Sequence, residues 1–279
     1  IKAIKNDIAI YAAHTNVDNV IDGVNGRIAD KIGLINRRIL QPKTGMLVKL
    51  VTFVPKLHVQ RVREAIFEAG VGHIGNYDAC SYNSEGYGSF RANSKATPFV
   101  GEVNKIHYEE ETRIEVILPE YIQNKVIASM IKAHPYEEVA FDVYPLSNTH
   151  NQIGAGMVGK LPKAVDAEEF LFSVKEILHL GCIRHTDLKN KKVQKIALCG
   201  GSGSFLINDA INCNADIYMT GDIKYHDFFI PENGMILADI GHYESEQFTK
   251  ELIYTLLKKK FTTFALFISG TNTNPVNYL

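Results

Sequence analysis

The middle of the chain repeats one pattern of hydrophobic and polar positions. A hydrophobic strand run, a proline turn and an amphipathic helix occur twice, with the two prolines, Pro55 and Pro119, 64 residues apart. A further strand closes each half. The predicted elements are strands at 47–54, 81–90, 112–118 and 139–144 and helices at 59–69 and 126–133. Two β-α-β halves of this kind predict a ferredoxin-like α+β domain over 46–147, inserted into a loop of another domain.

The segments on either side of this insert show strands that alternate with helices. Polar or Gly-rich residues follow several strand runs, as at the carboxyl ends of strands in a mainly parallel sheet. The predicted elements are a helix tail from residue 1, helices at 22–33, 167–180, 205–212 and 246–259, strands at 8–13, 193–199, 217–219, 235–238 and 263–269, and a linker at 41–45. We therefore predict that 1–45 and 148–279 form an α/β core with a mainly parallel or mixed sheet.

The composition is that of a folded protein of about two domains. The chain has 279 residues, of which 46% are hydrophobic. Its formal net charge of −1 creates no broad field for nucleic acid or a membrane surface. No apolar run reaches the roughly 20 residues that span a bilayer. The four cysteines lack the close spacing of zinc knuckles or redox pairs, which favours free thiols and a cytoplasmic location.

Metal-binding chemistry is indicated most clearly near the end of the chain. His242 and Glu246 are four residues apart at a predicted helix start, so their side chains can share one helix face. Gly241 permits a sharp turn from strand to helix. An imidazole and a carboxylate placed together suit zinc, manganese or iron. The same residues also fit a solvent-exposed helix start, where the helix dipole favours acidic side chains.

A second polar cluster lies near the beginning of the chain. His14 and Asp18 follow the predicted strand at 8–13, and we expect them in a turn. A buried polar cluster of this kind needs hydrogen-bond or ion partners. Asp18 taken alone fits a cap or turn residue as well as a ligand.

A third polar cluster, at 220–226, follows another predicted strand. It contains an acid, a base and an imidazole, which makes Asp222, Lys224 and His226 candidate proton carriers. An ordinary polar loop between a strand and a helix explains the same composition.

Two further segments have simpler explanations. The Gly-rich stretch at 200–204 could hold phosphate through backbone N–H groups, but it lacks the pattern of a P-loop or a dinucleotide fingerprint. We interpret it as a tight turn beside the site. The stretch at 134–138, His-Pro-Tyr-Glu-Glu, lies inside the insert, where we expect it to structure a turn or an interface. No Ser or Cys is next to a recognisable base, as a nucleophile requires.

In combination, these motifs resemble one family. They are His-Thr-Asn-Val-Asp at 14–18, Ile-Gly-Asn-Tyr-Asp-Ala-Cys-Ser at 74–81, Gly-Tyr-Gly-Ser-Phe at 86–90, the 134–138 stretch, Thr-Gly-Asp at 220–222, Gly-His-Tyr-Glu-Ser-Glu at 241–246 and Thr-Asn-Pro-Val at 273–276. Their order and identity resemble the NGG-interacting-factor-three-like family, whose members are often called GTP cyclohydrolase I type 2 homologues. The resemblance spans essentially the whole chain.

The resemblance implies a two-lobed α/β core with a dinuclear metal site, an insert similar to PII-like and CutA-like proteins, and assembly into a homohexamer. Carried over by position, Asp18 matches the acid that contacts both metals, and His242 and Glu246 match further ligands. The expected pocket neighbours are His14, Thr15, Asn16, Gly201, Ser202 and Thr220. The ligand types permit two ions of zinc, manganese, iron or nickel.

One part of the family pattern is not in this sequence. A His-His-Pro motif that supplies two more His ligands would lie upstream of residue 1. Helical periodicity starts at Ile1, without Met and without a capping residue. We therefore expect the chain to be an N-terminally truncated fragment.

Three functions follow as hypotheses. A dinuclear site suits a metal-dependent hydrolase of the GTP cyclohydrolase type, acting on a nucleotide or another small molecule. The same site suits a protein that stores, delivers or senses metal, with the insert as a ligand-binding or partner module. A transcription-factor partner rests on the family name alone, and the net charge gives no support for direct contact with nucleic acid.

Overall fold

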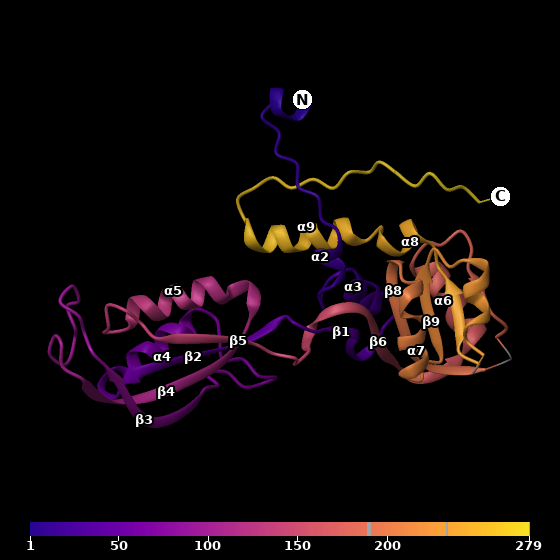
Figure 1. Cartoon of the computed structure of the whole chain (residues 1–279). Coiled ribbons are helices and arrows are strands. Elements are labelled where there is room, and N and C mark those ends of the chain that lie inside the picture. The colour runs from indigo at the N-terminus through magenta and orange to yellow at the C-terminus, as the bar shows by residue number, and fades with distance from the viewer. Residues whose placement is uncertain (189–190, 233, 279) are drawn as a thin grey trace. The chain divides into compact units, whose positions relative to one another are not determined.

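The computed structural model describes residues 1–188, 191–232 and 234–278. It separates into two compact units. Unit 1 combines Ile1–Lys43 with Asn151–Leu279, and unit 2 is Thr44–His150. The corresponding predicted limits are 1–45 with 148–279 for the core and 46–147 for the insert. Unit 2 thus interrupts unit 1 in the sequence, and each unit has its own sheet and core (Figure 1).

Unit 2 has the β-α-β repeat that the sequence predicts. Its elements are β2 (Leu47–Pro55), η1 (Lys56–His58), α4 (Val59–Glu68), β3 (Tyr82–Phe90), β4 (His107–Pro119), η2 (Glu120–Ile122), α5 (Gln123–Ala133) and β5 (Phe141–Pro145). The four strands lie in the order β3-β4-β2-β5, and every neighbouring pair is antiparallel. This is the order of a ferredoxin-like sandwich. The apolar faces of α4 and α5, including Val62, Ile66 and Met130, pack in one core with the sheet.

Unit 1 is built on a six-stranded mixed sheet in the order β1-β6-β8-β9-β10-β7. The central strands β8, β9 and β10 are parallel, and β6 and β7 run antiparallel to their neighbours β8 and β10. The strands are β1 (Ile35–Lys43), β6 (His150–Asp166), β7 (Arg184–His185), β8 (Lys192–Ser202), β9 (Ile217–Gly221) and β10 (Ile236–Asp239). The helices are α1 (Lys2–Lys5), α2 (Thr15–Asp18), α3 (Val24–Lys31), α6 (Ala167–Ile177), η3 (Ser204–Leu206), α7 (Ile207–Asn212), η4 (Tyr225–Phe229), α8 (His242–Glu246) and α9 (Thr249–Lys260).

Both faces of the central strands are buried, as parallel strands require. On β9, Ile217 and Met219 belong to the core that includes α3 and α6, whereas Tyr218 between them belongs to the core that includes α7. The same alternation occurs on β8 and β10. The short apolar runs that predicted these strands therefore mark positions covered by helices on two sides.

Two predicted strands are wrong. Residues 8–13 and 263–269 form no strand, and several of their apolar side chains are exposed, with Tyr11 at 83% and Phe267 at 92%. An apolar run becomes a strand only where a sheet edge is free to pair with it. Neither segment pairs with β1 or β7, the edge strands of the unit 1 sheet.

Three other predictions need correction. The linker predicted at 41–45 begins as strand, because β1 is an edge strand and tolerates Pro42. The turn predicted at His14 and Asp18 is the single helical turn α2. The helix predicted at 246–259 is two helices, α8 and α9, with the buried Phe248 between them. Within the described residues, the two core segments group into one unit around one sheet.

No helix in the described part of the chain combines the length and the apolar character needed to cross a membrane.

Candidate functional site

The parallel strands of unit 1 end in polar residues at one edge of the sheet. Their register aligns Thr220 with Asp239, and β8 ends at Ser202 opposite Gly221. Three residues at these ends, Gly201, Asp222 and Gly241, have positive φ angles of 65°, 55° and 80°. The backbone therefore turns sharply where each strand ends, and the following side chains face the edge where α/β proteins place their ligands.

His242 is the centre of the polar contacts at this edge. Its Nδ1 donates a hydrogen bond of 2.6 Å to Asp222 Oδ2, and its Nε2 lies 3.5 Å from Glu246 Oε2. The Asp222 hydrogen bond, with smaller contributions from Glu246 and Asp18, raises the pKa of His242 against the opposing effect of burial. Because Asp222 fixes the proton on Nδ1, the second ring nitrogen is oriented toward Glu246. Carboxylates often orient metal-binding histidines in this manner.

Asp18 reaches the same cluster from the other end of the chain. Burial raises its pKa, and the nearby imidazoles of His14 and His242 lower it. Burial also raises the pKa of Glu246; His242 opposes this shift, and Asp18 adds to it. The carboxyl groups at the start and the end of the chain therefore act on the same imidazole and on each other.

The buried thiol nearest to this cluster is unsuited to nucleophilic attack. Burial, with the charges of Asp18 and Glu246, raises the pKa of Cys199 to about 12. The thiol therefore stays protonated near neutral pH. All four cysteines of the chain are free, as the sequence predicts.

The backbone of the Gly200-Gly201 turn is held by two buried side chains that the sequence analysis missed. Asn25, on α3, accepts a hydrogen bond of 2.8 Å from the Gly200 N–H and donates one of 2.9 Å to the Asp18 carbonyl. Ser245, on α8, accepts a bond of 2.9 Å from the Gly201 N–H and donates one to the His242 carbonyl. Both side chains are at most 2% exposed. The sequence contained one sign of this role, because Asn25 is a polar residue on the face of the predicted helix that is buried.

Gly201 is also a steric requirement of the site. A Cβ at this position would lie 2.3 Å from Glu246 Oε1 and 3.4 Å from His242 Nε2. The Thr220 hydroxyl, fully buried, donates a hydrogen bond of 3.2 Å to the Gly201 carbonyl. The Gly-rich stretch is therefore a tight turn beside the His-Glu pair.

The other expected residues lie at the surface. His14, Thr15, Asn16 and Ser202 are exposed, and of these His14 influences the charges of Asp18 and Glu246. Lys224 and His226 are exposed at the start of η4, where the Lys224 N–H donates to Asp227. Within the described residues, no hydrogen bond or ion pair joins Lys224 or His226 to His242.

A cavity of about 540 Å³ adjoins the cluster. Asp222, His242 and Arg184 line it, together with the segment around Asn274. That segment is held by Glu244, whose buried Oε1 accepts hydrogen bonds from Asn274 Nδ2 and the Tyr278 hydroxyl at 2.9 and 3.2 Å. The final segment of the described chain thus forms one wall of a space into which a small molecule fits.

The donor set accommodates a metal ion only in part. Ligands bonded to one ion at 2.0–2.2 Å lie about 3–3.5 Å apart, which matches the separation of His242 Nε2 and Glu246 Oε2. Among the residues that the structure describes, however, no three His, Cys, Asp or Glu side chains are grouped closely enough to hold a metal ion. His242 and Glu246 therefore fit an ion as a pair, and Asp18 interacts with them through its charge.

The family model for Duf34/NIF3 (NGG1p interacting factor 3) matches residues 1–275. The chain belongs to this family. Two relatives described as GTP cyclohydrolase 1 type 2 homolog, from Halalkalibacterium halodurans and Bacillus subtilis, are each 40% identical to it, over 286 and 287 residues. In both cases the match covers 100% of this chain and 76% of the relative. The predicted family resemblance is confirmed.

Two solved structures have a similar fold. A Bacillus cereus protein related to NIF3 is 39% identical with a TM-score of 0.83, and the match covers 100% of this chain and 76% of that one. A Staphylococcus aureus protein is 30% identical with a TM-score of 0.70, with coverage of 100% and 74%. The α/β fold of this chain, with one mixed and one antiparallel sheet, is therefore similar to that of these two structures.

The Asn25→Ala substitution tests whether this side chain holds the site together. It leaves the Gly200 N–H and the Asp18 carbonyl without their partner, and each unsatisfied buried group costs about 1–3 kcal/mol. We expect a loss of unfolding free energy of about 2–4 kcal/mol in unit 1, measured by urea titration, with faster hydrogen exchange at Gly200. Asn208→Ala, at an exposed position on α7, is the matched control. Equal stability of the two variants would contradict this assignment.

Proposed function

We propose that this chain binds divalent metal at the carboxyl edge of β8, β9 and β10, with His242 and Glu246 as the ligand pair and Asp18, whose charge acts on both, as a third candidate ligand. The observation that supports it best is the orientation of His242, whose Nδ1 is engaged by Asp222 while its Nε2 faces Glu246 at 3.5 Å. The family resemblance implies a dinuclear site, with zinc, manganese, iron or nickel as the candidate ions.

We further propose that the activity is hydrolysis of a nucleotide or similar small molecule, as the relatives' description as GTP cyclohydrolase 1 type 2 homologs suggests. A metal pair, when bound, supplies an activated water molecule near neutral pH. Asp222 holds the proton on His242 Nδ1, and Gly201, which has no side chain, leaves space beside Glu246. The adjoining cavity offers Arg184 and the Asn274 segment for substrate contacts. Lys224 and His226 remain candidate proton carriers.

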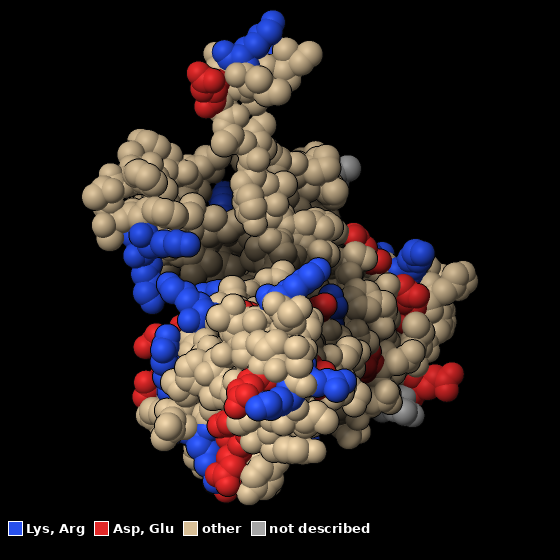
Figure 2. Space-filling model, turned by 60° about the vertical axis from the view of Figure 1, so that its left-hand side comes forward, with Lys and Arg blue, Asp and Glu red and all other residues tan. Residues whose placement is uncertain are grey.

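A second candidate function is metal storage or delivery. His242 is 50% exposed and Glu246 is 35% exposed, so a bound ion would remain accessible to an acceptor protein. In this reading the ferredoxin-like unit 2 acts as a regulatory module similar to PII-like and CutA-like proteins. Direct contact with nucleic acid is not proposed, because basic and acidic side chains lie among one another on the face shown in Figure 2. A cytoplasmic location remains a prediction from the sequence.

The Asp222→Asn substitution tests the role of Asp222 in metal binding. The amide cannot hold the Nδ1 proton as the carboxylate does, and loss of such an orienting partner typically weakens metal affinity 10–100-fold. We expect this weakening for Zn²⁺ or Mn²⁺ in competition titrations with a chromogenic chelator. The control is Asp187→Asn, outside the cluster. An affinity unchanged by Asp222→Asn, or lowered equally by both substitutions, would contradict the proposed orientation.

Catalysis is tested with metal-loaded protein and GTP. Hydrolytic opening of the purine ring releases formate, so we expect formate at many equivalents per protein, with the rate lost in Glu246→Gln and retained in the exposed control Glu169→Gln. Absence of formate, together with stoichiometric transfer of metal to an apo acceptor enzyme, would favour the delivery function and reject the hydrolase.

Self-association is a further part of the proposal. Apolar side chains of unit 1, among them Ile10, Tyr11 and Phe267, are largely exposed in the single chain, which supports burial against other copies. We expect a homohexamer, the assembly implied by the family resemblance, in sedimentation velocity at micromolar concentration. Replacement of Ile10 and Tyr11 by Ser should lower the oligomeric state, and a wild-type monomer would contradict the expectation.

A further inference from the structure

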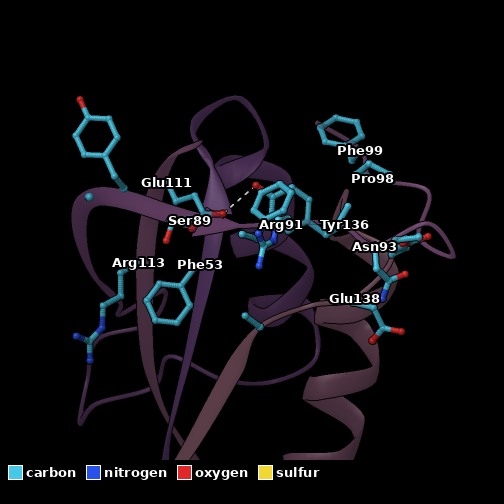
Figure 3. A pocket seen from close by; sticks show the side chains of 18 of the residues that line it. Phe53, Ser89, Arg91, Asn93, Pro98, Phe99, Glu111, Arg113, Tyr136 and Glu138 are labelled. Carbon is cyan, nitrogen blue, oxygen red and sulfur yellow. Dashed lines mark hydrogen bonds between the residues drawn. The ribbon is translucent and has the colours of Figure 1, made fainter. Parts of the chain in front are cut away.

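A second cavity, larger than the one beside His242, lies wholly within unit 2, and none of the expected site residues lines it. Its volume is about 680 Å³. The end of β3, the segment 91–99, strand β4 and the segment 136–140 surround it (Figure 3). The size suits a small molecule. The cavity includes part of the His-Pro-Tyr-Glu-Glu stretch, which the proposed metal chemistry does not use.

Aromatic rings form the walls of this cavity. Tyr136 lies centrally, with ring centroids 6.1 Å from Phe90 and 6.2 Å from Phe99. Phe53 also lines the space. Ring faces carry partial negative charge, so a set of rings around one space attracts a cation as well as apolar carbon.

His134 fixes the position of the central ring. Its Nε2 donates a hydrogen bond of 3.0 Å to the Phe53 carbonyl, and its Nδ1 accepts one of 3.1 Å from the Tyr136 N–H. Burial lowers the pKa of His134, which keeps the imidazole in the neutral form that these two bonds require. The walls are therefore organised in the absence of a ligand.

A buried carboxylate lies among these rings. Glu111 is 8% exposed, and its Oε1 accepts a hydrogen bond of 2.9 Å from the Tyr136 hydroxyl (Figure 3). Its Oε2 lies next to Gly88, and a Cβ atom added at Gly88 would lie 2.2 Å from this oxygen. Among the described residues, the Tyr136 hydroxyl is the one hydrogen-bond donor to this carboxylate. A buried carboxylate held by one neutral donor retains acceptor capacity for a further, preferably charged, partner.

The remaining charges of the lining are mainly acidic. Glu85, Glu137 and Glu138 line the cavity with two arginines. Arg113 pairs with Glu115, which does not line the cavity, at 2.8 Å, and its side chain points away from the aromatic rings in Figure 3. Arg91 is exposed. Glu85, Glu137 and Glu138 are exposed as well, and Glu85 pairs with Lys56 at 3.6 Å. The buried charge of the lining is therefore the Glu111 carboxylate, which favours a positively charged partner.

We propose that this cavity in unit 2 binds a small organic cation, an ammonium or amidinium group on an apolar body, with Glu111 accepting its N–H groups and Phe90, Phe99 and Tyr136 enclosing it. A charged hydrogen bond to a buried carboxylate supplies selectivity over neutral and anionic molecules of the same shape. The proposal concerns unit 2 alone and does not depend on the proposed metal site.

The test uses the whole chain and three matched probes, phenethylammonium, 2-phenylethanol and phenylacetate, with affinities from NMR chemical-shift titration. We expect phenethylammonium to bind at least tenfold more tightly than the other two, with shifts confined to the lining residues, namely Phe53 and residues of 84–99, 111–113 and 136–140. Glu111→Gln preserves the shape and removes the charge, so it should weaken phenethylammonium binding about 10- to 100-fold and leave 2-phenylethanol unaffected.

The matched control is Glu110→Gln, the next residue on β4, whose carboxylate pairs with Lys56 and does not line the cavity. It should bind phenethylammonium as the wild type does. If Glu111→Gln fails to fold, Phe90→Leu serves as a second test, and we expect it to lower the affinity for phenethylammonium severalfold. Equal binding of the neutral probe, equal effects of the two Glu→Gln variants, or preference for phenylacetate through Arg91 would each overturn the proposal. His242→Ala, in unit 1, should change none of these affinities.

Discussion

The site of unit 1 depends on one buried amide. Asn25 joins the carbonyl of Asp18 to the N–H of Gly200, and thereby ties the segment that carries the first acid to the end of β8. Buried backbone groups must find partners, and this side chain supplies both a donor and an acceptor where the register of β8 with β9 shifts, between Leu198 and Ser202. Residues separated by more than 170 positions in the sequence are in this way held in one cluster.

The polar side chains at this edge stay close because the backbone around them is tightly constrained. Gly201 and Gly241 adopt positive φ angles, and a side chain at either position would collide with a carboxylate of the site. Ser245 joins the two turns through the Gly201 N–H and the His242 carbonyl. The burial that raises the pKa of Asp18 and Glu246 is a cost that the fold tolerates. Clusters of acids that are costly for stability occur preferentially at functional sites.

The two units divide the chemistry of the chain. Unit 1 gathers charged side chains at the ends of parallel strands and exposes them to solvent, an arrangement suited to metal ions and polar substrates. Unit 2 encloses a carboxylate among aromatic rings, which suits a ligand that is both apolar and cationic. Unit 2 is inserted between β1 and β6 of unit 1. The first and last strands of unit 2, β2 and β5, are neighbours in its sheet. An insert of this kind can be added to a core with little effect on folding.

The sequence by itself determined the repeat of unit 2, the three parallel strands of unit 1, the family and the pairing of His242 with Glu246, because each rests on periodicity or on residues close in sequence. It could not determine that 8–13 and 263–269 remain unpaired, since pairing depends on whether a segment meets an edge strand of the sheet in three dimensions. It also gave no sign that Asp222 orients His242, or that Ser245 and Asn25 hold the glycine turn. Those roles arise from contacts between segments far apart in the chain, and only the tertiary structure decides which distant polar groups meet.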